Sequence, residues 1–382
     1  MSEITTNEKP VYIDPRIFNV HKTDYQNTPL FLGQQNGLFD TINKRHKVFD
    51  DLFNRMAAYD WRETEFTFQD CNYQFRTCAP YEYDLMITTI AWQWEADTAA
   101  ARSMIRILSA YITSPNLWKL FVEITKNEIV HASTYSRMVE LSFDNPDEII
   151  SDVVGKMEAL RRMERFAGVM SHALDVAIEL ETGKTARDSV RAYDAIMMLI
   201  CALLCMERVQ FVASFGVTFG KGNAGKFVQF SNAVSKICTD ELEIHAETDF
   251  AILEIEFGTE RGIEFLQRRG ADIQALVDDV RQSELNWIDY IAANGADKDP
   301  DISIDGLRTE VDLNAEPVYR FFGFKKELPY LTGRRLPYME TMIKIDQVQG
   351  AAQEERKGNY MLGGIINNDE GVDFSALAAD LV

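Results

Sequence analysis

Residues 120–135 of the chain read LFVEITKNEIVHASTY, a stretch with a carboxylate and an imidazole three positions apart. Residues at this spacing lie on one face of a helix, so Glu128 and His131 can point into the same space. One such pair on each of two helices, with an acid from each of two others, builds a two-metal carboxylate site inside a helical bundle. The pair alone is weak evidence, because Glu and His meet at this spacing by chance in many helices.

Most of the remaining sequence has the periodicity of helices with one buried face. The patterns cover residues 81–112, 117–142, 148–182, 187–220, 225–256 and 260–293. Segment 187–220 is apolar nearly all round, which predicts a central helix. Residues 1–35 are expected to be irregular, and a loose region is expected from Asn294 to Pro317. Long helices with short connections favour an all-α helical bundle.

The C-terminal part of the chain differs in composition from this helical body. From about Gln347 the sequence is rich in Gly, Asn and acids, and such a segment cannot bury enough surface to order itself. Its last apolar residues have helical spacing, which favours docking on a partner: Phe374, Leu377 and Leu381. We therefore expect a single domain over residues 1–345 and a flexible docking tail over residues 346–382.

The charge balance and the cysteines argue against several classes of function. Lys and Arg number 39 against 60 Asp and Glu, and the resulting net charge of −21 argues against nucleic acid as a partner. The five cysteines form no CxxC pair, so neither a zinc site nor a disulfide framework is indicated. No secretory signal opens the chain, and the longest apolar stretch, Ala195 to Leu204, is too short to cross a bilayer. We expect a cytoplasmic protein with no membrane partner.

Three further segments place candidate ligands on helices. Asp97 lies in WQWEADTAAA, where a solvated surface position is the alternative. Glu207 lies in the most apolar helix, where a lone carboxylate is costly unless it binds metal or pairs, for example with the adjacent Arg208. The segment TDELEIHAE supplies Glu241 and His245, which share a helix face. Two clusters of acid and histidine and two further acids make a dinuclear metal site the leading hypothesis.

Beyond these ligands, the chain resembles the radical-generating small (beta) subunit of class I ribonucleotide reductases over nearly its whole length. The matching positions are Trp61 in YDWRETE, Asp97, Glu128 to Tyr135 in EIVHASTY, Glu207 with Phe211 and Phe215, Asp240 with Glu241, and Tyr360. All ferritin-like diiron proteins share the metal-ligand pattern, whereas the combination with Trp61, Tyr135 and Tyr360 is specific to the reductase subunit. The resemblance implies a ferritin-like bundle.

The resemblance also implies a role for each position. The first metal ion would be bound by Asp97, Glu128 and His131, and the second by Glu207, Glu241 and His245, with Glu128 and Glu241 bridging. Tyr135 matches the radical tyrosine, in an apolar pocket formed by Phe211, Phe215 and Phe219. Trp61 and Asp240 match the electron-transfer chain that leads to His131. Tyr360 and Glu354 match the relay toward the large subunit.

The activity that the resemblance implies is reduction of ribonucleotides to deoxyribonucleotides, performed with a separate large (alpha) subunit. Residues 374–382 would anchor that subunit, and the small subunit would be a homodimer. Two iron ions are the first choice of cofactor, since Tyr135 argues against the family branch that lacks the tyrosine and uses a manganese–iron pair. Two manganese ions, loaded through a flavoprotein, are the second choice.

One spacing departs from the family pattern. The family has Glu-x-x-His in its last ligand helix, whereas this chain has one residue more between Glu241 and His245. A single π-helical turn could absorb the extra residue. A regular helix would also keep both side chains on one face. Glu243 and Glu247 are the alternative ligands in this segment.

Two other classes of function remain open at this point. A ferritin-like diiron oxidase or hydroxylase would use the same ligands on a substrate of its own and would need neither Tyr360 nor a partner-binding tail. A metal-storage or interaction protein would not need the hydroxyl group of Tyr135.

Overall fold

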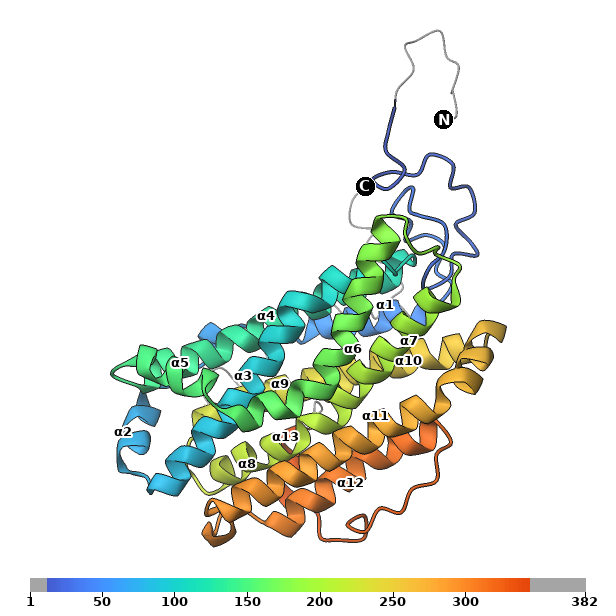
Figure 1. Cartoon of the computed structure of the whole chain (residues 1–382). Coiled ribbons are helices and arrows are strands. Elements are labelled where there is room, and N and C mark those ends of the chain that lie inside the picture. Colours follow the sequence, from blue (N-terminus) through green and yellow to red (C-terminus); the bar gives the residue numbers. More distant parts are fainter. Residues whose placement is uncertain (1–11, 344–382) are drawn as a thin grey trace, which may run out of the picture.

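The computed structural model describes residues 12–343, which form a bundle of long α-helices (Figure 1). The first helices are α1 (Lys47–Ala58), α2 (Gln69–Thr77), α3 (Pro80–Leu108), α4 (Pro115–Ser142), α5 (Pro146–Val154) and α6 (Met157–Glu181). They are followed by α7 (Val190–Cys205), α8 (Val212–Asn223), α9 (Val228–Asp240), α10 (Ala246–Phe257), α11 (Glu260–Ala293), α12 (Ile304–Phe321) and α13 (Pro337–Ile343). Between residues 12 and 343 there is no strand, only an isolated bridge from Phe31 to Ile112. The predicted all-α bundle is confirmed.

Two short π-helical turns interrupt this pattern. The turn η2 (Met206–Gln210) joins α7 to α8, and the turn η3 (Glu241–His245) joins α9 to α10. A π-turn inserts an extra residue into a helix without ending it, so each pair of helices continues in nearly one direction. Both turns contain candidate metal ligands.

Local sequence signals set where the long helices begin. Proline occupies the first position of α3 and of α4, at Pro80 and Pro115, where a helix needs no N–H donor. The hydroxyl groups of Ser114, Ser189 and Thr259 accept hydrogen bonds from the first turns of α4, α7 and α11. Each of these caps satisfies a backbone N–H that has no partner inside its helix.

The segment of α7, η2 and α8 lies at the centre of the bundle, as predicted for residues 187–220. In Figure 1 α6 and α11 run alongside it, and α6, α10 and α11 pack against α7. By length and composition Val190–Asn223 could cross a membrane, contrary to the expectation that its apolar stretch is too short. However, 94% of its most apolar window is buried inside the protein, which is the behaviour of a core helix.

Two expectations about the helices are wrong. The pattern over residues 148–182 belongs to two helices, α5 and α6, because the chain turns at Gly155. The region up to Pro317 is loose only at its start, since α12 begins at Ile304 and contains the proline. The apolar face of α12 is buried, and this burial outweighs the cost of about 3 kcal/mol for a proline inside a helix.

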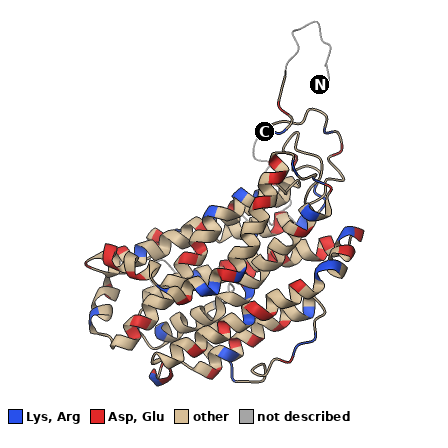
Figure 2. Ribbon diagram, in the orientation of Figure 1, with Lys and Arg blue, Asp and Glu red and all other residues tan. Residues whose placement is uncertain are grey.

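The acidic residues are spread over the whole bundle rather than gathered on one face. In Figure 2 they occur on nearly every helix, together with basic residues. In the described part of the chain, the excess of acidic residues is therefore not confined to one face. The carboxylates that concern function are a small buried subset.

Candidate metal centre

All six candidate ligands meet in the core of the bundle. Asp97 comes from α3, Glu128 and His131 from α4, Glu207 from η2, and Glu241 and His245 from η3. Each of the six side chains is at most 2% exposed. They form two groups with ligand atoms within 4.8 Å of one another: Asp97, Glu128, His131 and Glu241 in one, and Glu128, Glu207, Glu241 and His245 in the other. Glu128 and Glu241 belong to both groups, so their carboxylates lie between the two positions.

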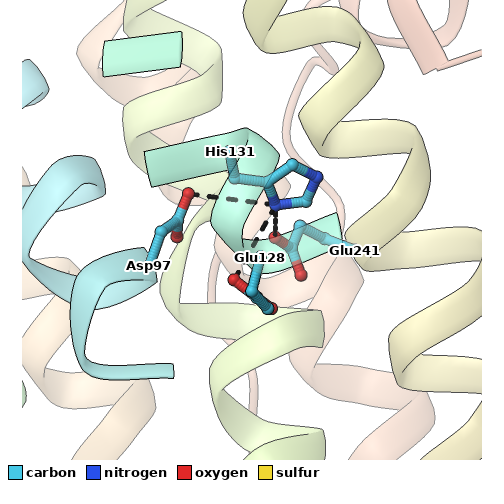
Figure 3. A group of neighbouring side chains, drawn as sticks. All are labelled: Asp97, Glu128, His131 and Glu241. Atoms are coloured by element: carbon cyan, nitrogen blue, oxygen red, sulfur yellow. Dashed lines mark ion pairs between the residues drawn. The ribbon is translucent and has the colours of Figure 1, made fainter. Parts of the chain in front are cut away.

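Figure 3 shows that the first group converges on the imidazole of His131. Its Nδ1 atom lies 3.0 Å from Oε1 of Glu241, 3.8 Å from Oε2 of Glu128 and 3.9 Å from Oδ2 of Asp97. In the second group, Nδ1 of His245 lies 2.9 Å from Oε2 of Glu241 and 3.3 Å from Oε1 of Glu128. Both histidines therefore turn the same nitrogen toward the carboxylates.

The polar atoms at this centre fit a pair of metal ions. Seven of them are buried and make no hydrogen bond of good geometry: Oδ2 of Asp97, both carboxylate oxygens of Glu128, Nδ1 of His131, Oε2 of Glu207, Oε1 of Glu241 and the hydroxyl oxygen of Tyr135. Buried polar atoms are almost always partnered, so a cluster of such atoms requires an explanation. Carboxylate oxygens and imidazole nitrogens are ligands that iron and manganese accept. The residues present can hold two such ions.

The electrostatics of the protein alone show why a cation would be stabilised here. Burial raises the pKa of Asp97 well above its ordinary value, and the carboxylates of Glu128 and Glu241 raise it further. Burial also raises the pKa of Glu128 and of Glu207, and Glu241 adds to both effects. For Glu241 burial acts in the same direction, but His245, Glu207 and His131 outweigh it and lower its pKa. Four carboxylates thus compete for limited positive charge.

The extra residue between Glu241 and His245 is accommodated by the π-turn η3, one of the two possibilities that the sequence left open. Both side chains stay on the face toward α4. The alternative ligands do not reach the centre: Glu243 is half-buried and forms an ion pair with Arg55, and Glu247 is exposed. The second π-turn, η2 at Glu207, was not expected from the sequence.

Asp240 links the centre to Trp61. Its Oδ2 atom accepts hydrogen bonds from Nε1 of Trp61 at 2.7 Å and from Nδ2 of Asn127 at 3.0 Å, and it lies 3.1 Å from Nε2 of His131. The rings of Trp61 and His131 are also stacked, with centroids 5.8 Å apart. A carboxylate that holds the outer nitrogen of an imidazole fixes its orientation and leaves the inner nitrogen for a metal ion.

Asn127 is a residue that the sequence reasoning missed. Its amide oxygen lies 3.1 Å from Nε2 of His245, and its amide nitrogen donates to Asp240. The side chain of Asn127 therefore holds the outer nitrogen of His245, as Asp240 holds the outer nitrogen of His131. Its position one turn before His131, on the face of α4 that holds the ligands, is the signal that could have identified it.

Tyr135 is fully buried and follows His131 by one turn of α4. Burial raises the pKa of its phenol well above the ordinary value, and the carboxylates of Asp97, Glu241 and Glu128 raise it further. Three buried rings, one between η2 and α8 and two on α8, form a stack, with centroids 5.6 Å apart for Phe211 and Phe215 and 6.1 Å apart for Phe215 and Phe219. The expected aromatic series is thus present in the core. Tyr360, Glu354 and the apolar residues of the tail lie outside the described residues.

The helical bundle and its buried cluster of carboxylates and imidazoles define a ferritin-like protein with a site for two metal ions. Comparison with known families makes the assignment more specific. Residues 39–306 match the family "Ribonucleotide reductase, small chain", and the chain belongs to this family. The beta subunit of ribonucleoside-diphosphate reductase from Enterobacteria phage T4 is 20% identical over 378 residues, which cover 92% of this chain and 96% of that protein.

Solved structures share the fold. The ribonucleotide reductase R2 subunit from Clostridium botulinum superposes with a TM-score of 0.66 at 17% identity, covering 86% of this chain and 98% of that one. An R2-like ligand-binding oxidase with a Mn/Fe cofactor superposes with a TM-score of 0.57 at 15% identity, covering 79% and 98%. At these identities the likeness concerns the fold alone.

Proposed function

We propose that this chain is the radical-generating beta subunit of a ribonucleoside-diphosphate reductase and that Tyr135 holds the radical. The observation that carries the proposal is the phenol of Tyr135, which is buried without a hydrogen-bond partner and within the electrostatic influence of Asp97, Glu241 and Glu128. A dry, apolar position protects an oxidised side chain from water and from unwanted reductants. The names of the relatives, such as the phage T4 beta subunit, support a diphosphate substrate.

The six buried ligands would hold two metal ions, the first between Asp97, Glu128 and His131 and the second between Glu207, Glu241 and His245. Glu128 and Glu241 would bridge them, because each belongs to both groups. When bound, a pair of redox-active ions supplies the oxidising power, drawn from dioxygen, for removal of an electron from Tyr135. Iron is our first choice and manganese the second, since these ligands accept both.

The chain's own residues would conduct electrons to and from this centre. Trp61 would deliver to the metal centre the electron that is needed beyond the one taken from Tyr135. Asp240 joins the indole N–H of Trp61 to His131, and the rings of Trp61 and His131 are stacked. The oxidising equivalent would later leave through Trp61 and Tyr360, with Glu354 near the relay. Residues 346–382 would bind the large subunit through their apolar end, and residues 1–345 would form one domain of a cytoplasmic homodimer.

The test is electron paramagnetic resonance after addition of ferrous iron and air to the metal-free protein. We expect a tyrosyl signal that disappears in Tyr135→Phe and persists in Tyr111→Phe. Tyr111 is a suitable control because it is also fully buried, but its hydroxyl donates to the Ala173 carbonyl at 2.7 Å, away from the ligands. Absence of the signal from the wild-type chain with two bound iron ions would refute the radical role with iron. The same signal in Tyr135→Phe would refute the role of Tyr135.

A second candidate function is an oxidase that acts on a substrate of its own. A cleft of about 930 Å³ between α6 and α11 favours it, because the cleft reaches Gln210, three residues from Glu207. Truncation after Ile345 separates the two functions. An oxidase would keep its activity without the tail, whereas a reductase subunit would keep its metal ions and lose ribonucleotide reduction with its large subunit.

A further inference from the structure

A buried ion pair lies against the backbone of the π-turn that contains Glu207. Arg162 from α6 and Glu284 from α11 are 4% and 0% exposed, and Nη2 and Nε of the arginine lie 2.5 and 3.1 Å from Oε1 of the glutamate. The guanidinium group is also enclosed by two indole rings, with centroids 4.0 Å away for Trp92 and 4.5 Å away for Trp287. None of these residues is a candidate metal ligand.

The pair bonds the backbone at the end of η2. Nη2 of Arg162 donates to the carbonyl of Gln210 at 2.8 Å, and Glu284 lies near the backbone N–H of Ala213 at the start of α8. The side chain of Gln210 donates in return to the carbonyl of Arg162. In a continuous α-helix the carbonyl of Gln210 would accept a hydrogen bond from the N–H of Ser214, so here Arg162 provides a donor where the pattern of helical hydrogen bonds changes.

The indole ring above the arginine holds the next residue as well. Trp92 contacts Phe211 with ring centroids 5.7 Å apart, and Phe211 is the residue between η2 and α8. Two neighbouring groups at the junction are therefore held by side chains from other helices: the carbonyl of Gln210 by Arg162 and the ring of Phe211 by Trp92. Contacts from separate helices that converge on one point of the backbone indicate that these side chains set the backbone conformation there.

The position of Glu207 depends on this conformation. Each residue of an α-helix adds about 100° of rotation. A π-turn contains one residue more than a regular turn of α-helix. If η2 became a regular turn, Glu207 would therefore rotate about the helix axis by about 100° relative to α8. Its carboxylate would then leave the group that it forms with Glu128, Glu241 and His245.

We propose that Arg162 and Glu284 are positioning residues, which maintain the π-turn η2 and thereby aim Glu207 at the second metal position. This inference rests on the proposed two-metal site and goes beyond it by naming residues that bind no metal. A buried ion pair often adds little net stability compared with apolar side chains of similar size. A conformational role accounts for its presence better than a purely energetic one.

The double variant Arg162→Met with Glu284→Gln removes the charge pair without leaving one partner alone. The matched control is Arg281→Met with Asp312→Asn, a second buried ion pair. It joins α11 to α12 at 2.6 Å, and Asp312 also accepts from the backbone N–H of Tyr330 rather than from η2. Metal-free full-length protein is titrated with Mn²⁺, and bound ions are counted by electron paramagnetic resonance. Hydrogen exchange of the peptide over residues 206–214 is measured on the same metal-free samples.

In the Arg162 and Glu284 variant we expect the second ion to bind about 10- to 100-fold more weakly, with the first ion unchanged and faster exchange over residues 206–214. The control should retain both affinities and the slow exchange. Equal behaviour of the two double variants in both measurements would overturn the proposal. If the first variant does not fold, Arg162→Lys replaces it, since lysine keeps the charge but lacks the planar fork that reaches Glu284 and Gln210 together.

The two proposals fail in different ways. If the wild-type chain binds fewer than two Mn²⁺ ions, the two-metal site of the proposed function is wrong. The hydrogen-exchange comparison then still decides whether the ion pair maintains η2. If the wild-type chain binds two ions and the variants differ neither in affinity nor in exchange, only the role of Arg162 and Glu284 is wrong.

Discussion

Replacement of Asp240 by Asn tests the link between the metal centre and Trp61. The change keeps the size of the side chain and removes one charge. All three polar neighbours of Asp240 use the same oxygen, with Trp61 at 2.7 Å, Asn127 at 3.0 Å and His131 at 3.1 Å. The amide oxygen of an asparagine can take this place, so the hydrogen bonds can persist in weaker form.

The size of the effect follows from the number and type of these bonds. A hydrogen bond to a charged group contributes about 1.5–3 kcal/mol, and a neutral one about 1 kcal/mol. Each bond would lose about 0.5–2 kcal/mol, so weakening of all three should lower the free energy of unfolding of the metal-free protein by about 1.5–6 kcal/mol. The acceptor that orients His131 would also lose its negative charge, and weakening of such a support lowers metal affinity by about 10- to 100-fold.

The assay combines urea unfolding of the metal-free protein with a titration of metal ions. Asp50→Asn is the control, because Asp50 is also a buried aspartate, paired with Asn116 at 2.6 Å and Lys119 at 3.2 Å, and is not part of either ligand group. We expect both variants to lose stability and only Asp240→Asn to lose metal affinity. Unchanged affinity in Asp240→Asn would refute the argument that this carboxylate prepares His131 for a metal ion.

Three further predictions concern other groups. Tyr135→Phe should raise the free energy of unfolding of the metal-free protein by about 1 kcal/mol, since the buried hydroxyl has no partner; a decrease in chemical denaturation would contradict this. Lys221→Met should lower the free energy of unfolding by about 3–5 kcal/mol, because the ammonium group of Lys221 is buried among three carboxylates. The side chain of Lys226 at the same cluster is 44% exposed, so Lys226→Met should lower it by less than about 1 kcal/mol in the same assay. Metal binding should release protons and become stronger as pH rises toward 10. Burial lowers the pKa of His245, but Glu241 and Glu128 outweigh this effect and raise it to about 10, so below that pH an ion must displace a proton. Calorimetry in buffers of different ionisation enthalpy measures the number of protons released.

The bundle and the ligand group could be predicted because their signals are local. Glu128 and His131 are three residues apart, and Glu207 is conspicuous as a carboxylate in an apolar helix. The π-turn at Glu241 could be foreseen as one of two solutions, because its ligand spacing has one residue too many. The π-turn at Glu207 could not, since a single ligand in a segment provides no spacing to compare.

Other features depend on contacts between distant segments. Arg162 and Glu284 are 122 residues apart, and each reads in sequence as one more charge on an amphipathic helix. Asn127 lies next to a ligand, but only the assembled core shows that it supports His245. For α12 the presence of Pro317 obscured a helix that tertiary packing stabilises.

The two halves of the centre differ in the regularity of the backbone that carries their ligands. Asp97, Glu128 and His131 stand on α3 and α4, which are 29 and 28 residues long and continue without interruption past the ligands. Glu207, Glu241 and His245 stand on π-turns of five residues each. Since Arg162 and Trp92 hold η2 in place, we expect the backbone of η3 to adjust to ions of different radius, while the side next to Tyr135 keeps its dimensions.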